Sequence, residues 1–235
     1  MKKLLDTLAR YTLFPEDFPC LGCGCEMPLD RHHLCQSCAG LLEPAVKVCP
    51  VCGRSGDGTV CRDCEKGRRF VKAVAAYNYT GSCKGIIYAM KYRDTLYAAD
   101  FMAWDMVACC DFASKVDIVT SVPSRREALL RRGYNQSREL AVRCARLMDR
   151  PYIELLEQKR GAKPQHELSA AQRRENYADS IYGIYPLEGQ TVLLIDDVFT
   201  TGATADACAQ VLTDNGASEV YVAVFASVPA FDKKS

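Results

Sequence analysis

Apolar runs and amphipathic stretches alternate along the chain from residue 70 onward. The runs have the length and the β-branched content of buried strands, and the stretches between them repeat apolar residues at helical spacing. Strands are predicted over 71–79, 116–122, 181–185, 191–195 and 219–226. Helices are predicted over 84–92, 96–111, 136–149 and 203–215. This alternation is typical of an α/β fold built on a doubly wound parallel sheet.

The segment before residue 69 follows a different pattern. Apolar residues at near-helical spacing predict a short amphipathic helix over 2–14. From Cys20 to Cys64, cysteine, glycine and proline are frequent and apolar runs are short. This segment therefore needs a metal site or a covalent cross-link to fold stably. We therefore expect a small N-terminal domain over 1–68 and an α/β domain over 69–235.

The composition is that of an ordinary globular protein. The 235 residues are 49% hydrophobic and 25% charged, and the net charge of +1 does not by itself indicate a nucleic-acid partner. No apolar run is long enough to span a bilayer, and Asp6 and Arg10 interrupt the stretch that a signal peptide would need. We expect a cytoplasmic protein, in which clustered cysteines bind metal more often than they form disulfides.

Eight of the 14 cysteines form four Cys-x-x-Cys pairs. Two thiolates separated by two residues can hold one zinc ion from a tight turn, and two such pairs complete a tetrahedron. The sequential pairing assigns one zinc ion to Cys20, Cys23, Cys35 and Cys38 and a second to Cys49, Cys52, Cys61 and Cys64. The spacing alone leaves an interleaved pairing open.

Other ligands and another chemistry are conceivable near the first cysteine set. Cys25, His32 and His33 could each replace a ligand, but we expect them to be bystanders because a Cys₄ set is already complete. A thiol redox role for one pair is the other alternative, although no thioredoxin-like βαβ pattern surrounds any of them.

The run from Val192 to Thr204 suggests binding of a sugar phosphate. Four apolar residues predict a buried strand, Asp196 and Asp197 follow where we expect that strand to end, and a loop of threonine and glycine leads into a helix. Ligands of α/β sheets bind at the carboxyl ends of strands, and a helix N-terminus presents N–H groups to a phosphate. Two adjacent acids can hold vicinal hydroxyls or a metal. The run therefore indicates a site for a ribose 5-phosphate; the alternative is a polar turn without a ligand.

The run from Asp196 to Thr204 resembles the phosphoribosyl-pyrophosphate (PRPP) motif of type I phosphoribosyltransferases, and two further segments could complete a site for PRPP. Ser124, Arg125 and Arg126 follow a predicted strand, and arginine pairs with phosphate oxygens in two-point contacts. The alternative is a strand end with surface arginines. In the polar loop over 158–176, Lys163 and His166 are candidates for contact with the pyrophosphate or for proton transfer, and a solvated loop is the alternative.

Basic residues are concentrated between residues 118 and 176, where the sequence has 13 lysines and arginines and only 7 acidic residues. This excess fits an anionic small molecule and fits a nucleic-acid backbone equally well. Tyr134, Tyr152 and Tyr177 lie in the same region and could stack against the bases of a single strand.

The acid pair and its loop resemble the PRPP motif of type I phosphoribosyltransferases, and the chain as a whole resembles the ComF family. The wider resemblance extends from Cys20 to Val228. The segments that carry it are the cysteine pairs, Arg132-Gly133-Tyr134-Asn135-Gln136, Gln165 with Leu168, Arg173-Arg174 and Asn176, and the run from Ile195 to Thr204. Tyr134 stands where the family commonly has phenylalanine.

The resemblance implies a double zinc ribbon joined to a type I phosphoribosyltransferase-like domain. It implies that Asp196 and Asp197 are the catalytic pair and hold the ribose hydroxyls, and that the loop after them wraps the 5′-phosphate. The residues assigned to that loop contact are Val198, Thr200, Thr201, Gly202, Ala203 and Thr204. It also implies a role in DNA uptake or in handling single-stranded DNA, with PRPP, Mg²⁺, single-stranded DNA and proteins of the DNA-uptake machinery as partners.

Three functions are compatible with these motifs. The first is an enzyme that transfers a phosphoribosyl group from PRPP, with Arg125 and Mg²⁺ stabilising the leaving pyrophosphate and with an unidentified acceptor. The second is a nucleic-acid-binding module that uses the fold as a scaffold. The third is a sensor that binds PRPP without turnover, because a binding motif does not distinguish binding from catalysis.

Overall fold

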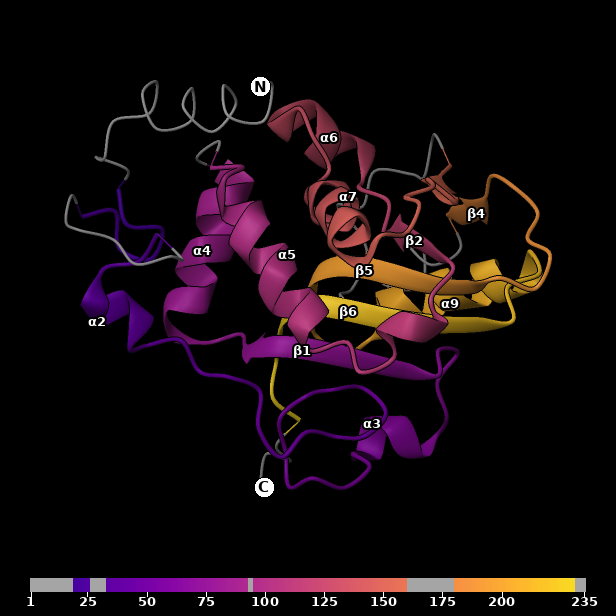
Figure 1. Cartoon of the computed structure of the whole chain (residues 1–235), viewed down its shortest axis with the longest axis horizontal. Coiled ribbons are helices and arrows are strands. Elements are labelled where there is room, and N and C mark those ends of the chain that lie inside the picture. The colour runs from indigo at the N-terminus through magenta and orange to yellow at the C-terminus, as the bar shows by residue number, and fades with distance from the viewer. Residues whose placement is uncertain (1–18, 26–32, 93–94, 160–179, 231–235) are drawn as a thin grey trace, which may run out of the picture.

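A computed structural model describes residues 19–25, 33–92, 95–159 and 180–230 of the chain, with a four-stranded parallel sheet at its centre (Figure 1). The strand order is β1–β6–β5–β2, and every neighbouring pair is parallel. These strands are β1 (Lys72–Asn78), β2 (Ile118–Ser121), β5 (Thr191–Phe199) and β6 (Glu219–Ser227). A separate antiparallel pair consists of β3 (Leu156–Gln158) and β4 (Ile181–Gly183). The helix expected over 2–14 lies outside the described residues.

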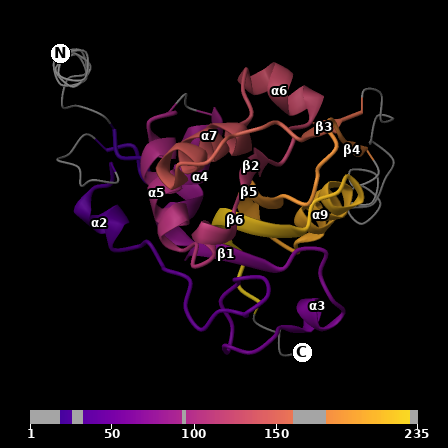
Figure 2. The same cartoon turned by 45° about the vertical axis from the view of Figure 1, so that its right-hand side comes forward.

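Helices cover both faces of this sheet (Figures 1 and 2). Alternate residues of β5 explain why: Leu193 and Ile195 are buried against α4, α5 and α7, whereas Val192 and Leu194 are buried with α9 on the other face. These helices are α4 (Gly81–Tyr92), α5 (Ala98–Ala108), α7 (Gln136–Met148) and α9 (Ala203–Asp214), and a 3₁₀ helix spans Ala113–Lys115. The predicted fold class, a doubly wound α/β sheet, is confirmed.

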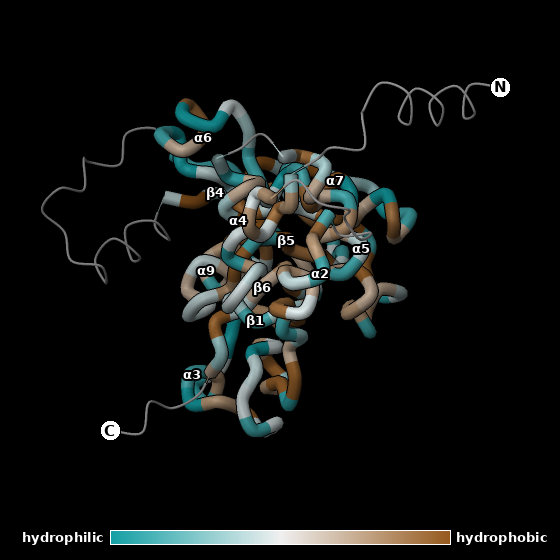
Figure 3. Tube along the Cα trace, turned by 90° about the vertical axis from the view of Figure 1, so that its left-hand side faces the viewer, coloured by the Kyte–Doolittle hydropathy of each residue, from teal (hydrophilic) through white to brown (hydrophobic). Residues whose placement is uncertain are grey.

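The structure adds a helix that the sequence pattern did not predict. Helix α6 (Arg126–Arg132) follows β2 and buries none of its residues. Leu129 and Leu130 are exposed on it, beside several charged residues, so α6 lacks the apolar stripe that marks a helix in a sequence. Figure 3 shows hydrophilic and hydrophobic residues side by side on this helix at the outer edge of the molecule. None of the helices in the described ranges is long and apolar enough to cross a membrane.

The segment from residue 33 to residue 68 wraps around the edge of the sheet. It contains two short helices, α2 (Gln36–Ala39) and α3 (Arg62–Glu65). Between them, residues 43–51 run along β1: the N–H of Asn78 donates to Glu43 O, and the N–H of Ala73 donates to Val51 O. These bonds satisfy backbone groups at the outer edge of β1 that would otherwise be open for pairing with another chain.

The two cysteine sets pack on opposite faces of the sheet. Cys20, Cys35 and Cys38 belong to the buried cluster that contains α4, whereas Cys49, Cys52 and Cys64 belong to the cluster that contains α9. The cysteine-rich segment therefore shares its apolar contacts with the α/β part of the chain. The boundary at residues 68 and 69 stays a prediction.

Strand β5 is longer than the apolar run that predicts it. We expected the strand to end at Ile195, but it continues to Phe199, with Asp196 opposite Val224 and Phe199 opposite Ser227 of β6. The partner strand supplies backbone hydrogen bonds along this whole length, so tertiary pairing extends β5 through two charged residues. The acid pair lies inside the strand, in its carboxyl-terminal half.

Substitution of Gly53 tests how the cysteine-rich segment docks on β1. Gly53 has a φ of +68°, and a Cβ atom there would lie 2.6 Å from Ala73 O and 2.8 Å from Val74 Cα. We expect Gly53→Ala to lower the free energy of unfolding by roughly 2–4 kcal/mol, because it combines backbone strain with a clash. The measurement is urea denaturation of the metal-loaded protein.

The matched control is Gly58→Ala. Gly58 also has a positive φ, +93°, but a Cβ atom there would meet nothing within 4 Å. We expect it to cost about 1 kcal/mol, which is the backbone term alone. Equal losses for the two variants would contradict close docking at Gly53.

Candidate functional site

The two adjacent acids of β5 are held by side chains from different helices. Asp197 forms an ion pair with Lys91, near the end of α4. Asp196 Oδ1 accepts hydrogen bonds from Ser137 Oγ at 2.8 Å, in the first turn of α7, and from the Asp197 N–H at 2.9 Å. The acid pair therefore has a fixed orientation at the carboxyl-terminal half of the central strands, where α/β sheets bind ligands.

The electrostatics of the two acids differ. Burial and the neighbouring Asp197 carboxylate raise the pKa of Asp196 to about 7, against the opposing effect of the Ser137 hydrogen bond and of Lys91. Burial alone would lower the pKa of Lys91, but the Asp197 carboxylate outweighs burial and raises it. The site thus combines a firm ammonium–carboxylate pair with a second carboxyl group that can carry its proton near neutral pH. Together, the two carboxyl groups can accept hydrogen bonds from hydroxyl groups and can also donate a hydrogen bond to one.

The loop after β5 leads directly into α9. Gly202 has a φ of +84° and precedes Ala203, the first residue of α9. A Cβ atom on Gly202 would collide with the Phe199 ring and with Arg68, so glycine is required here for two reasons. The carbonyl groups of Thr200 and Thr201 accept hydrogen bonds from buried arginines. The first N–H groups of α9 have no partners within the helix and are suited to an anion.

The segment after β2 lies at the same edge of the sheet. Because β2 pairs with β5 in parallel and Ser121 lies opposite Ile195, the segment of Ser124, Arg125 and Arg126 follows a strand end beside the start of the acid pair. Ser124 and Arg125 are half-buried and Arg126 is exposed. The backbone of this segment thus begins near the acid pair in the sheet. Lys163 and His166 lie outside the described residues, and their roles stay predictions.

The Arg-Gly-Tyr-Asn-Gln motif joins three elements around the acid pair. Gly133 ends α6, and the Tyr134 hydroxyl donates a hydrogen bond to Met90 O in α4. The Asn135 side chain caps α7 by accepting from the Ser137 N–H at 3.1 Å, and it donates to Val122 O at 3.0 Å. The motif therefore fixes the start of α7, which positions the Ser137 hydroxyl on Asp196.

Sequence reasoning missed Lys91 and Ser137, the two partners of the acid pair. Ser137 follows Asn135 at a helix start, where an N-cap signal was readable. Lys91 lies next to the apolar positions Ile86, Ile87 and Met90 of a predicted helix. A lysine beside the buried face of a helix is a weak indication of a functional role.

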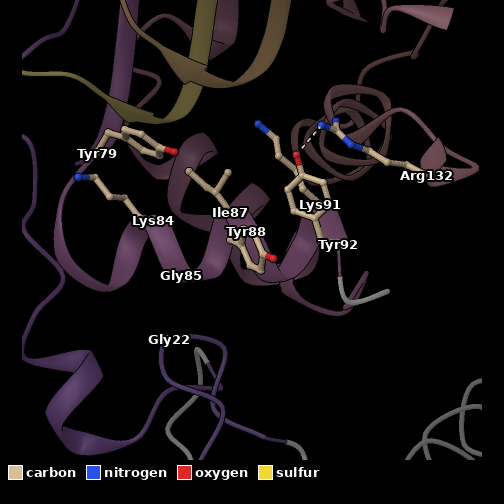
Figure 4. Close-up of a pocket in the computed structure, with 9 residues that line it drawn as sticks. All are labelled: Gly22, Tyr79, Lys84, Gly85, Ile87, Tyr88, Lys91, Tyr92 and Arg132. Atoms are coloured by element: carbon tan, nitrogen blue, oxygen red, sulfur yellow. Dashed lines mark hydrogen bonds between the residues drawn. The ribbon is translucent and has the colours of Figure 1, made fainter. Parts of the chain in front are cut away.

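A recess of about 680 Å³ lies beside Lys91 (Figure 4). The residues that line it are Gly22, Tyr79, Lys84, Gly85, Ile87, Tyr88, Lys91, Tyr92 and Arg132. Tyr88 and Tyr92 lie one helical turn apart, with ring centroids 4.8 Å from each other, and each is about half exposed. The guanidinium groups of Arg131 and Arg132 lie 5.8 and 5.1 Å from the Tyr92 ring. The recess therefore combines aromatic faces with positive charge.

The structure brings the cysteines together in the two sequential sets. In each set, the four sulfur atoms lie within 4.8 Å of one another. Zinc with Zn–S bonds of roughly 2.3 Å requires sulfur–sulfur distances of about 3.8 Å. The observed distances of 3.9 Å between Cys23 and Cys35 and of 3.6 Å between Cys52 and Cys61 fit that tetrahedron. Both sets can therefore bind a zinc ion structurally, and the interleaved pairing is not the one observed.

Backbone N–H groups support the thiolate form of two ligands. The Cys35 N–H points to Cys20 Sγ at 3.3 Å, and the Cys61 N–H points to Cys49 Sγ at 3.4 Å. Burial raises the pKa of each thiol, but these and neighbouring N–H groups outweigh it and lower the pKa of Cys20 to about 6 and of Cys49 to about 7. Cys25 is outside the first set and His33 packs edge-on against Tyr97, while His32 is not among the described residues.

Curated relatives resemble the chain over most of its length. The DNA utilization protein YhgH of Salmonella typhimurium is 29% identical over 210 residues, which cover 84% of this chain and 92% of that protein. The competence protein ComFC of Bacillus subtilis is 27% identical and covers 79% of this chain and 80% of its own. Competence protein F of Haemophilus influenzae is 24% identical over 88% of this chain and 95% of its own. The predicted resemblance to the ComF family is confirmed.

Solved structures that match the chain include two phosphoribosyltransferases. The purine enzyme of Pyrococcus horikoshii is 20% identical, with a TM-score of 0.37 over 58% of this chain and 81% of that chain. The adenine enzyme of Thermoanaerobacter pseudethanolicus is 15% identical, with a TM-score of 0.36 over 59% of this chain and 84% of that chain. No family model matches the chain.

Single cysteine substitutions test the ligand sets. We expect Cys23→Ser to reduce bound zinc from two ions to one per chain, because it removes a member of the first set and a neutral hydroxyl is a poor replacement for a thiolate. The measurement is elemental analysis of protein purified without added chelator. Cys25→Ser is the matched control, since Cys25 lies two residues away and outside the set, and it should retain both ions. Loss of zinc in the Cys25 variant would show that the ligand assignment is wrong.

Proposed function

We propose that the chain binds PRPP with Mg²⁺ at the edge formed by β5 and α9 and serves DNA uptake or the handling of single-stranded DNA. The observation that carries this proposal is the combination of an oriented acid pair, Asp196 and Asp197, with a glycine-containing loop at the N-terminus of α9. One part suits vicinal hydroxyls and the other suits a phosphate, and a ribose 5-phosphate carries both groups.

Each residue of this site would have a distinct role. Asp196 and Asp197 would accept hydrogen bonds from the ribose hydroxyls and orient the sugar, the loop from Val198 to Thr204 would bind the 5′-phosphate with its amides, and Arg125 would face the pyrophosphate. Mg²⁺ would supply charge neutralisation to the pyrophosphate. A bound phosphate remote from the reacting carbon contributes binding energy that a transfer reaction can use.

A transferase would need one more property of the acid pair. When pyrophosphate leaves, the ribose acquires positive charge at its anomeric carbon, and nearby carboxylates stabilise such charge. Asp197 pairs with Lys91 in the free protein, so a sugar entering the site would meet a carboxyl group that is already oriented. No acceptor is identified, so the proposal covers binding with turnover and binding as a sensor.

The names of the relatives support the cellular part of the proposal. ComFC and competence protein F are named for competence, and YhgH is named for DNA utilization. We extend that context to this chain. The two Cys₄ sites would stabilise the segment before residue 69, and a cytoplasmic location stays a prediction.

Calorimetric titration of PRPP with Mg²⁺ into the wild type and Asp197→Asn tests the proposed site. We expect binding by the wild type and a roughly 10- to 100-fold weaker Kd for the variant, which loses charge-assisted hydrogen bonds to the ribose. Asp214→Asn is the matched control, because Asp214 is exposed at the far end of α9 and an amide can still accept from Gln210. Absence of binding to folded, metal-loaded wild type would refute both the enzyme and the sensor.

A second function, binding of single-stranded nucleic acid, is supported by the recess beside Lys91. Tyr88 and Tyr92 offer two adjacent ring faces, and Arg131 and Arg132 lie close to the second ring. Bases stack on such rings regardless of sequence, and guanidinium groups pair with the backbone. Elsewhere in this basic region, Arg143 is used internally, since it pairs with Asp100 and Glu139.

The double variant Tyr88→Leu, Tyr92→Leu tests the second function. We expect it to weaken binding of a fluorescent oligothymidylate by roughly 10-fold or more, because each stacked base contributes about 1–3 kcal/mol. The measurement is fluorescence anisotropy at two salt concentrations. Tyr185→Leu, at a similarly exposed tyrosine, is the matched control. Equal affinities for the two variants would exclude this tyrosine pair as the binding surface.

A further inference from the structure

Two buried arginines lie between the second cysteine set and the loop that follows β5. Arg54 directs its Nε at Cys52 Sγ, 3.4 Å away, and its Nη2 at Cys61 Sγ, 3.3 Å away. The same guanidinium donates from Nη1 to Thr200 O at 3.2 Å and from Nη2 to Asp63 at 2.6 Å. The Arg54 side chain thus contacts two of the four sulfur atoms of the second cysteine set and also the loop after β5.

Arg68 repeats this arrangement from the other side of the cysteine set. Its Nε points to Cys64 Sγ at 3.4 Å, its Nη2 donates to Thr201 O at 2.9 Å, and its Nη1 donates to Asp206 at 2.5 Å. Only 6% of the Arg54 side chain and 7% of the Arg68 side chain is exposed. Buried guanidinium groups need several fixed acceptors, and here the acceptors belong both to the cysteine set and to the loop.

Charge explains why arginines occupy these positions. Four thiolates around one Zn²⁺ carry a formal net charge of −2. The two guanidinium groups offset part of this negative charge within a buried region, and they also pair with Asp63 and Asp206. Hydrogen bonds to charged sulfurs orient the guanidinium forks, as the partners behind metal ligands generally do. The remaining N–H groups of each fork then have fixed directions toward Thr200 and Thr201.

These contacts shape the loop for an anion. The carbonyls of Thr200 and Thr201 are bound by the arginines, so they are held away from a phosphate that would meet the amides. Asp206, in the first turn of α9, would repel a phosphate at that helix end, and Arg68 neutralises it. Arg68 also lies against Gly202, at the point where the loop turns into the helix.

We propose that Arg54 and Arg68 are positioning residues through which the second Cys₄ metal site holds the phosphate-binding loop in its anion-binding shape. This inference rests on the proposed function for its consequence, the affinity for a 5′-phosphate. The physical link itself, from cysteine set to loop, is testable without any ligand. Loss of the second metal would then loosen a loop that contains none of its ligands.

Hydrogen exchange of the loop amides tests the link directly. In Arg68→Met we expect the amides of residues 200–204 to exchange at least about 10-fold faster than in the wild type, while β6 amides stay unchanged. Arg69→Met is the matched control, because Arg69 is the next residue and is exposed. Arg68→Lys, which keeps the charge but not the fork, is the second variant if Arg68→Met does not fold, with an intermediate effect expected.

Substituting one ligand of each cysteine set gives a second test of the link by hydrogen exchange. Cys64→Ser removes a ligand that Arg68 contacts and should speed exchange of the same loop amides, whereas Cys23→Ser in the first set should not. Unchanged loop exchange in the Arg68 variants, or equal effects of Cys64→Ser and Cys23→Ser, would overturn the proposal.

Ligand titration separates this inference from the proposed function. In Arg68→Met we expect the Kd for ribose 5-phosphate to rise roughly 10- to 100-fold and the Kd for pyrophosphate to change less than about twofold. A general loss of structure would weaken both ligands alike and would overturn a positioning role. If loop exchange responds as expected but the wild type binds neither PRPP nor ribose 5-phosphate, the link stands and the proposed function fails.

Discussion

The parallel pairing of β5 with β6 is the constraint on which the candidate site depends. It continues through Phe199 opposite Ser227, and the Val228 N–H donates one more hydrogen bond to Phe199 O. This pairing holds Asp196 and Asp197 within a strand, where their backbone cannot rotate. Lys91 and Ser137 can then meet fixed carboxylates, and the loop begins from a fixed point. A shift by one residue would exchange the faces of the two acids.

The sequence predicted the features that depend on local pattern. The strands around residues 72–78 and 219–227 are apolar runs, the helix at 203–214 repeats apolar residues at helical spacing, and the four cysteine pairs have a spacing that only a few chemistries use. The extent of β5 was not predictable, because its last residues are ordered by β6. The same is true of the arginine contacts: Arg54 and Thr200 are 146 positions apart, and no periodicity relates them.

The cysteine-rich segment and the α/β part of the chain stabilise each other. A segment this short, with few apolar residues, buries too little surface to fold by itself. Its cysteines instead complete the apolar clusters on both faces of the sheet, and its connecting residues cover the edge of β1. The metal sites are thus part of the main cores, and the second one is linked to the proposed phosphate loop through Arg54 and Arg68.

The pairing of β1 with β6 also determines the order in which the chain can assemble. Lys72 pairs with Tyr221, so the strand that the cysteine-rich segment covers has no neighbouring strand of the sheet until the residues of β6 have been synthesised. Parallel pairing between strands far apart in sequence forms slowly, and a strand that is still unpaired is prone to aggregation during this time. The cysteine pairs are close in sequence and can bind metal while the later strands of the sheet are still being synthesised. An early metal-bound segment would shield β1 during that wait.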